Sequence, residues 1–373
     1  MSVDNIFLMK NEIKEYDWGG YGFIPSLLGQ KKDGLPKAEM WLGAHKTFSS
    51  KILVDGQYVS LFNFLEIHKE LLGFGSELSF LFKILSVHKP LSLQIHPSKD
   101  IALKGFALEN NKKIVIDDSK RIYKDENPKV ELVYALSDFY ALKGFLPLDG
   151  INHIYRSLGL DFNFMTHESF VKTLFDLHEF EIENIIYKVL DNLNFIDEFR
   201  AFWFNEIYKM YGIDIGLLVF LGMYIFKLKT GEVFYTESRE VHAYLKGECI
   251  ELMTNSDNVI RAGFTTKHID KDEMLKVGKF EEGVFSLLKS ENIDGCDVFK
   301  LPGTNLSLFH KCIGGESYFE RVGVMILLVI KGKVQLNNRI SLKMGDSVFI
   351  GNCDCNKELS ICGNGEIFIA LSL

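Results

Sequence analysis

Four polar side chains stand at or near the ends of apolar, strand-like segments, and all four are of types that bind divalent metal ions. Gln94 and His96 lie two residues apart in LSLQIHPSKD (91–100), a spacing that points both side chains to one face of a β-strand. Glu131 begins a second apolar segment and His242 a third. Two imidazoles, a carboxylate and an amide oxygen would form a four-ligand site that leaves a divalent cation net positive charge and room for substrate oxygens.

The same four residues also have an ordinary structural interpretation. A Gln-x-His pair in a strand carries little information by itself, because short motifs are loose. Burying Glu131 without a partner would be costly, but a hydrogen bond to a neighbouring side chain would supply one. Each of the four would then be an isolated buried polar residue, and the spacing leaves both interpretations open.

The part of the chain that carries three of these residues is strand-like. Up to about residue 147 the apolar runs are short and are broken by Gly and Pro, which is typical of antiparallel sandwiches and barrels. The clearest of these runs are 38–45, 80–87, 91–96 and 130–137.

Between 148 and 222 the apolar period changes. Apolar residues recur at three- and four-residue steps in 167–193, and the pattern continues through 197–212 to a Gly suited to a helix C-terminus. This part therefore predicts amphipathic helices that interrupt a β-domain.

Strand-like patterns return after residue 222. They occur at 233–237, 241–245, 249–253 and 259–264, with a turn expected at Lys246–Gly247. The last segment, 294–373, alternates strand-like runs and turns, and one turn is expected at KGKV (331–334). Successive hairpins of this kind are typical of double-sheet jelly rolls.

Composition argues against several classes of partner. The chain has 373 residues, of which 47% are hydrophobic and 25% charged, as in a globular protein with a large core. Its formal net charge of −8 argues against nucleic acid or an anionic membrane as the main partner. The most apolar run, 215–226, is too short to span a bilayer, and the early charges in 1–18 are unlike a signal peptide.

The six cysteines show no spacing typical of a disulfide framework. Such a set suits a reducing cytoplasm, which is where we expect the protein to act. The CDC sequence at 353–355 would make half of a metal site at most, because no second Cys/His pair lies nearby, and we interpret these cysteines as structural.

Five segments resemble the type I mannose-6-phosphate isomerase family, and they occur in the family's order over nearly the whole chain. The segments are YDWGG (16–20), AEMWLGAH (38–45), LFKILSVHKPLSLQIHPSK (81–99), YKDENPKVEL (123–132) and the long block 231–270. The resemblance implies a mainly β fold with a helical insert: two cupin-type jelly-roll β-domains plus an α-helical domain. Its expected boundaries are 1–147 with 223–293 for the metal-binding cupin domain, 148–222 for the helical domain and 294–373 for the C-terminal jelly roll.

The resemblance also implies an activity and a cofactor. The family interconverts mannose 6-phosphate and fructose 6-phosphate, and its zinc ligands match Gln94, His96, Glu131 and His242. One Zn²⁺ per chain is therefore expected, with a small sugar phosphate as partner, no nucleic acid or membrane, and a monomeric state.

Further residues receive roles from the same resemblance. Arg261, Lys129 and Asp257 are expected to be catalytic, and Arg261 would stabilise the enediolate or bind substrate oxygens. Substrate contacts are expected from Lys267, Tyr244, Glu251 and Trp18.

One position departs from the family. Where the family reads His–Lys–Pro–Glu, this chain has Pro128, Lys129, Val130 and Glu131, so an imidazole that is a candidate for proton transfer is missing. Either that histidine is dispensable, or Asp257, Lys129 or metal-bound water carries the proton. The alternative function is a non-catalytic, metal-containing cupin that binds sugar phosphates.

Overall fold

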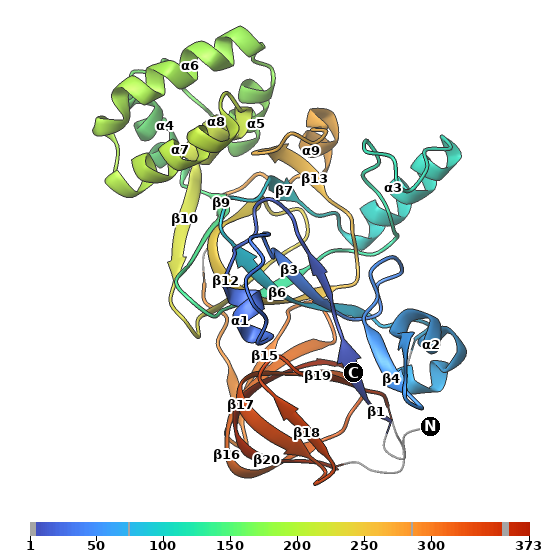
Figure 1. Ribbon diagram of the computed structural model, residues 1–373. Coiled ribbons are helices and arrows are strands. Elements are labelled where there is room, and N and C mark those ends of the chain that lie inside the picture. Colours follow the sequence, from blue (N-terminus) through green and yellow to red (C-terminus); the bar gives the residue numbers. More distant parts are fainter. Residues whose placement is uncertain (1–4, 74, 285, 353–357) are drawn as a thin grey trace.

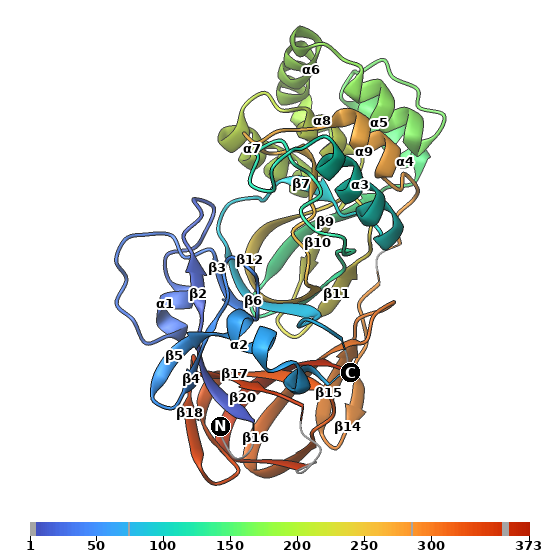
Figure 2. The same ribbon diagram turned by 90° about the vertical axis from the view of Figure 1, so that its right-hand side faces the viewer.

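The molecule consists of two large sheets and a group of helices, arranged in three tiers. The computed structural model describes residues 5–73, 75–284, 286–352 and 358–373. Figure 1 and Figure 2 both show the helices at one end, one curved sheet in the middle and the second at the other end. The mainly β, cupin-type fold with a helical insert that the sequence predicts is confirmed.

The middle sheet has ten strands in the described part of the chain, and it carries the candidate ligands. Its strands are β2 (Glu12–Lys14), β3 (Glu39–Leu42), β6 (Phe80–Val87), β7 (Leu93–Ile95), β8 (Glu131–Ala135), β9 (Phe139–Phe145), β10 (Met223–Leu228), β11 (Val233–Thr236), β12 (His242–Thr254) and β13 (Ile260–Gly263). Four expected strand runs, 38–45, 80–87, 91–96 and 130–137, correspond to β3, β6, β7 and β8.

Strand β12 holds this sheet together because it pairs with four other strands. Its first residues pair with β7 and β9, and its later residues pair with β6 and β8. The change of partners occurs at an irregularity between Tyr244 and Lys246. Such a bulge bends a strand and is common at the corners of closed sheets.

The expected turn at Lys246–Gly247 is therefore wrong, because the chain continues there as one strand. Gly247 has a φ of 124°, a conformation that favours glycine in turns and in bulges alike. The expected turn at 331–334 is wrong for the same reason, since β17 runs through Gly332 with a register shift just before it. Residue type alone does not distinguish a turn from a bulge.

The second sheet also has ten strands in the described residues, and it draws on both ends of the chain. Its strands are β1 (Ile6–Lys10), β4 (Lys51–Val54), β5 (Gln57–Ser60), β14 (Glu291–Ile293), β15 (Cys296–Lys300), β16 (Leu306–Glu320), β17 (Val324–Leu336), β18 (Ile340–Lys343), β19 (Ser347–Ile350) and β20 (Glu358–Ser372). The domain boundaries at 147, 222 and 293 stay a prediction, while hydrogen bonds place β1, β4 and β5 with the C-terminal strands.

The helical group forms where the sequence predicts amphipathic periodicity. Its helices are α4 (Leu148–Ser157), α5 (His167–Phe175), α6 (Glu179–Asn192), η2 (Leu193–Phe195), α7 (Glu198–Tyr211) and α8 (Ile215–Leu221). Side-chain caps fix their starts, as where Thr166 accepts from the amide of Ser169 and Asp197 from that of Arg200. Elsewhere lie α1 (Phe23–Leu27), α2 (Leu61–Ile67), η1 (Lys69–Leu72), α3 (Lys99–Asn111) and α9 (Lys271–Val277).

Three apolar cores connect the tiers. One joins the helices to the outer face of the middle sheet, where Phe170 and Phe220 pack with Leu93 and Ile260. A second lies between the two sheets, and a third fills the C-terminal sheet. Within the described residues no helix combines the length and apolar character needed to cross a bilayer. The apolar cores on either side of the middle sheet hold it in place, and with it the strand ends that carry the candidate ligands.

The bulge in β12 should tolerate no side chain at Gly247. A Cβ added there would lie 2.5 Å from the carbonyl oxygen of Asp138, so Gly247→Ala is expected to lower the free energy of unfolding by about 3 kcal/mol. The control is Gly295→Ala, where φ is also positive but the surroundings are open, and where a loss of about 1 kcal/mol is expected. Urea unfolding followed by circular dichroism measures both, and equal losses would contradict the close approach.

Candidate metal centre

Three of the four predicted ligands meet inside the middle sheet. His96 directly follows β7, Glu131 begins β8 and His242 begins β12. The Nε2 atom of His96 lies 3.3 Å from Oε1 of Glu131, and Nε2 of His242 lies 3.4 Å from Oε2 of the same carboxylate. All three residues are at most 2% exposed. Side chains far apart in the sequence thus offer ligand atoms that lie within 4.8 Å of one another.

The two imidazoles are oriented so that their Nε2 lone pairs face this centre. Nδ1 of His96 lies 2.8 Å from the carbonyl oxygen of Asn258, and Nδ1 of His242 lies 2.9 Å from that of Glu240. A carbonyl oxygen only accepts, so each Nδ1 carries the proton and donates it. In the neutral rings both Nε2 atoms are then acceptors, and both are buried without a hydrogen-bond partner.

A cation is the natural partner of such a set. Burial and the nearby Lys129 lower the pKa of His96 to about 3, so its ring stays neutral. A neutral Nε2 lone pair that faces a carboxylate oxygen is repelled unless a positive charge lies between them. The donor set of two imidazoles and one carboxylate is that of many catalytic zinc sites, so these residues fit the metal that the sequence implies.

The carboxylate of Glu131 is held in its charged form by its neighbours. The Tyr244 hydroxyl donates to Oε2 at 2.8 Å, and the ammonium of Lys129 lies 2.9 Å from Oε1. Burial alone would raise the pKa of Glu131, but the ammonium of Lys129 holds it well below its usual range. Lys129 and Tyr244, both predicted from the sequence, therefore contact the ligand set directly.

Gln94, the fourth predicted ligand, lies beside the other three across the strands. It is directly opposite His242 on β12 and opposite Arg261 on β13. Opposite residues of antiparallel strands share a face, so Gln94 projects to the side on which His242 lies. Its Oε1 accepts a hydrogen bond from Ser92 at 3.0 Å, and no hydrogen bond joins it to the three converging groups.

Arg261 and Lys267 form a positive region on β13 and the loop that follows it. Neither the guanidinium of Arg261 nor the ammonium of Lys267 makes an ion pair or hydrogen bond among the described residues. Burial lowers the pKa of Arg261, and burial together with the charges of Arg261 and Lys124 lowers that of Lys267. Unpaired, partly desolvated cations beside a metal site are suited to an anionic ligand.

Asp257 is paired with a histidine that the sequence analysis did not identify. Nε2 of His45 lies 2.8 Å from Oδ2 of Asp257, while Nδ1 of His45 accepts from the amides of Thr47 and Phe48. His45 therefore donates to Asp257. Burial would raise the pKa of Asp257, but His45 and the nearby lysines lower it to about 2. His45 is the last residue of AEMWLGAH (38–45), a segment that resembles the family, and this position could have identified it.

Glu251 belongs to a second buried charge group, centred on Lys83. The Lys83 ammonium lies 3.1 Å from Glu251 and 3.9 Å from Glu39, and 4.9 Å from the centroid of the Trp41 ring. Burial alone would lower the pKa of Lys83, but these carboxylates and Glu131 raise it. The sequence analysis missed Lys83, although a lysine inside the fully buried strand β6 was a signal.

Trp18 is the one predicted site residue that lies apart from these groups. Its carbonyl accepts from the amides of His88 and Lys89, and its ring packs 5.8 Å from that of Tyr16. It also borders the apolar cluster that contains Tyr244. Its contacts are packing contacts. The sequence CDC at 353–355 lies outside the described residues, so the structure does not address it.

Together the fold and the donor set define a cupin-type metalloprotein with a buried histidine–carboxylate centre. Residues 6–148 match the family model "Phosphomannose isomerase type I, catalytic domain". The mannose-6-phosphate isomerase of Salmonella typhimurium is 33% identical, over 91% of this chain and 93% of that protein. The Escherichia coli enzyme is 32% identical, over 96% of this chain and 97% of that protein.

Solved structures agree with this similarity. A zinc-bound mannose 6-phosphate isomerase matches with a TM-score of 0.91 and 29% identity, over 99% of both chains. The Salmonella typhimurium enzyme with fructose 6-phosphate and zinc matches with a TM-score of 0.90 over the same share of each chain. The chain belongs to the type I mannose-6-phosphate isomerase family.

Removing either imidazole should abolish metal binding. We expect His96→Ala and His242→Ala to fold, yet to retain less than about a tenth of the wild-type zinc, because each leaves the carboxylate with one nitrogen partner. Elemental analysis of the purified variants measures this loss. His178→Ala, in the helical group, is the matched control and should keep full zinc content. Full zinc in both site variants would contradict the ligand assignment.

Proposed function

We propose that this chain is a zinc-dependent aldose–ketose isomerase that interconverts D-mannose 6-phosphate and D-fructose 6-phosphate. In this proposal one zinc ion is held by Gln94, His96, Glu131 and His242. The observation that carries it is the convergence of two buried, partnerless imidazole nitrogens on one charged carboxylate. Membership of the isomerase family supplies the substrate and the reaction.

The reaction defines what the site must do. A proton moves between C1 and C2 of the open-chain sugar, through an enediolate whose charge lies on two neighbouring oxygens. When bound, zinc would supply Lewis-acid stabilisation of these oxygens. The protein must hold the sugar there, exclude water and move the proton, which acid–base catalysis accelerates by about 10²–10⁴-fold.

We assign the proton transfer to Lys129, which as a neutral amine would take the proton from one of the two carbons and as an ammonium would return it to the other. Its Nζ lies 2.9 Å from Oε1 of the candidate ligand Glu131, and the residue is 8% exposed. Asp257, with a pKa of about 2, is a weak base, and we propose that it accepts a hydrogen bond from a sugar hydroxyl instead. Pro128 cannot replace an imidazole, and its carbonyl serves structure by accepting from Thr254. The missing histidine is thus dispensable in this scheme.

The positive residues on and after β13 are assigned to the substrate's negative charges. Arg261, opposite the proposed ligand Gln94, would stabilise the enediolate or bind the substrate oxygens next to the metal. Lys267, further along the chain, would bind the dianionic phosphate. We propose that Tyr244 and Glu251, which contact Glu131 and Lys83, also contact the substrate, and that Trp18 does so as well.

The alternative function is a non-catalytic cupin that binds sugar phosphates. Pro128 is the observation that favours it, because it removes one candidate proton carrier. The unpaired Arg261 favours the enzyme, since a mere phosphate binder would not need a half-buried guanidinium opposite a metal ligand.

We further propose a monomer that acts in the cytoplasm and does not bind nucleic acid. The four described cysteines are free thiols, which suits a reducing compartment. The net charge of −8 disfavours nucleic acid. Gel filtration with light scattering tests the monomer.

Metal removal tests the function. Purified protein should convert mannose 6-phosphate to fructose 6-phosphate, lose at least about 99% of this activity after chelation, and regain it with zinc, because the enediolate then loses its main stabilising charge. A coupled assay of fructose 6-phosphate formation measures it. Protein that binds zinc and sugar phosphate but does not convert it would support the alternative instead.

Arg261 should matter for turnover and not for the metal. We expect Arg261→Ala to lower kcat/KM about 100-fold, as removal of a single oxyanion donor does elsewhere, with zinc content unchanged. Steady-state kinetics and elemental analysis measure the two effects. Arg156→Ala, on the exposed face of α4, is the control and should behave as wild type. Loss of zinc in Arg261→Ala would mean that the residue is structural.

A further inference from the structure

A four-residue turn, 237–240, precedes the proposed ligand His242 and is closed by the side chain of its last residue, Glu240. Oε2 of Glu240 accepts from the amide of Glu237 at 3.2 Å, and the amide of Glu240 returns to the carbonyl of Glu237 at 3.4 Å. Within it, Arg239 has a φ of 73°, an unfavourable conformation for a residue with a side chain. Surrounding contacts must hold such a turn in place.

This turn contacts both imidazole ligands. The carbonyl of Glu240 accepts from Nδ1 of His242 at 2.9 Å, and the amide of Arg239 donates to the carbonyl of His96. Because Nδ1 and Nε2 belong to one rigid ring, the position of the Glu240 carbonyl sets the direction of the His242 Nε2 lone pair. A shift of the 237–240 segment would therefore rotate the His242 ring so that its Nε2 no longer faces the metal.

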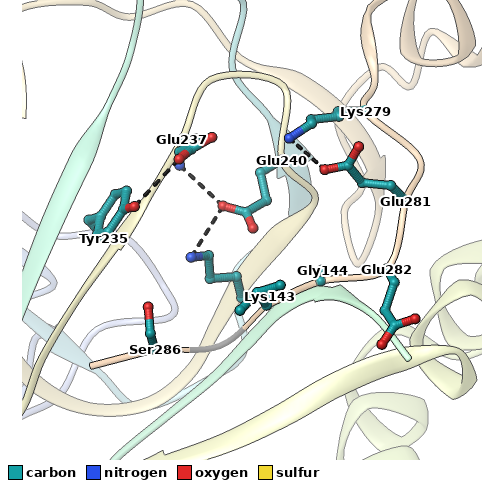
Figure 3. A pocket seen from close by; sticks show the side chains of 11 residues that line it. Lys143, Gly144, Tyr235, Glu237, Glu240, Lys279, Glu281, Glu282 and Ser286 are labelled. Carbon is teal, nitrogen blue, oxygen red and sulfur yellow. Dashed lines mark hydrogen bonds and ion pairs between the residues drawn. The ribbon is translucent and has the colours of Figure 1, made fainter. Parts of the chain in front are cut away.

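A buried lysine holds the turn from the neighbouring strand. Lys143, on β9 directly opposite His242, is 6% exposed, and its Nζ lies 3.4 Å from Oε2 of Glu240. Figure 3 shows Lys143 directed toward Glu240 at the wall of a cavity of about 240 Å³. Its ammonium also lies 5.0 Å from the centroid of the Tyr235 ring.

The burial of Lys143 indicates that its ion pair with Glu240 has a role beyond offsetting the cost of burial. Burying an ammonium costs several kcal/mol, and one carboxylate at 3.4 Å offsets this only in part. A second lysine on the same cavity, Lys279, pairs with Glu281 and is about half exposed. The main-chain amide of Lys279 donates to the carbonyl of Arg239 in the turn, but in the described part of the chain its side chain makes no hydrogen bond or ion pair with the turn. The side chain of Lys143 therefore contacts the 237–240 turn, whereas that of Lys279 does not.

We propose that the Lys143–Glu240 ion pair is a positioning pair for the metal. It fixes the 237–240 turn, and through the Glu240 carbonyl it holds the His242 ring in the direction in which Nε2 binds zinc. The inference rests on the proposed function in one respect, since it takes His242 as a ligand.

The test compares zinc affinity in matched variants. Lys143→Met keeps the length of the side chain and removes its charge, and we expect its zinc dissociation constant to rise about tenfold, as with other outer-shell changes. Lys143→Arg should restore it to within about threefold. Lys279→Met makes the same substitution on the same cavity and should leave the constant unchanged. Competition with a chromophoric chelator measures all four proteins.

A second measurement separates positioning from general destabilisation. In the cobalt-substituted proteins, the visible absorption bands of Lys143→Met should shift while those of Lys279→Met should not, because the bands report ligand geometry. Should Lys143→Met fail to fold, Glu240→Gln carries the same expectation, since it keeps the carbonyl and an acceptor for the Glu237 amide.

Two outcomes would overturn the inference. One is wild-type affinity and spectra in folded Lys143→Met, and the other is an equal loss in Lys279→Met. If the wild-type protein itself binds no zinc, the proposed function fails and the inference fails with it. If the wild type binds zinc and the variants do so equally well, the inference alone fails.

Discussion

Acceptor atoms of three buried residues face one another inside the middle sheet. The Nε2 atoms of His96 and His242 lie 3.3 and 3.4 Å from the two oxygens of Glu131, and neither nitrogen has a hydrogen-bond partner among the described residues. Each such buried group costs about 1–3 kcal/mol when unmatched. A cation bound between these atoms would convert their repulsion into attraction.

The sheet brings the three converging candidate ligands to the ends of strands. Strand β12 pairs with β7 and β8, so that His96, Glu131 and His242 share one corner of the sheet. The ends connect to loops whose carbonyls are free to accept from Nδ1, as those of Asn258 and Glu240 do. Main-chain carbonyls thus fix the orientation of both candidate imidazole ligands, and in our proposal the Lys143–Glu240 pair fixes the position of one of these carbonyls.

The periodicity of the sequence predicted those features of the structure that depend on residues close together in the chain. The period of two predicted that Gln94 and His96 point to one face, and the period near 3.6 located the helical group. Contacts between distant segments were beyond such patterns, and the pairing of His45 with Asp257 is of this kind. Gly247 was misread because a bulge and a turn require the same backbone conformation. Lys83 was missed because its partners come from other strands.

The pairing of β1 with β19 has a consequence for how the molecule is made. β1 pairs with the nearby strand β4 on one side, but on the other side Ile6 lies opposite Ile350, so this second pairing forms only after residue 350 has left the ribosome. Contacts of such sequence separation close late, since the loop entropy must be met first. The edge of β1 that pairs with β19 therefore stays uncovered until then, and unpaired strand edges of this kind are prone to aggregation.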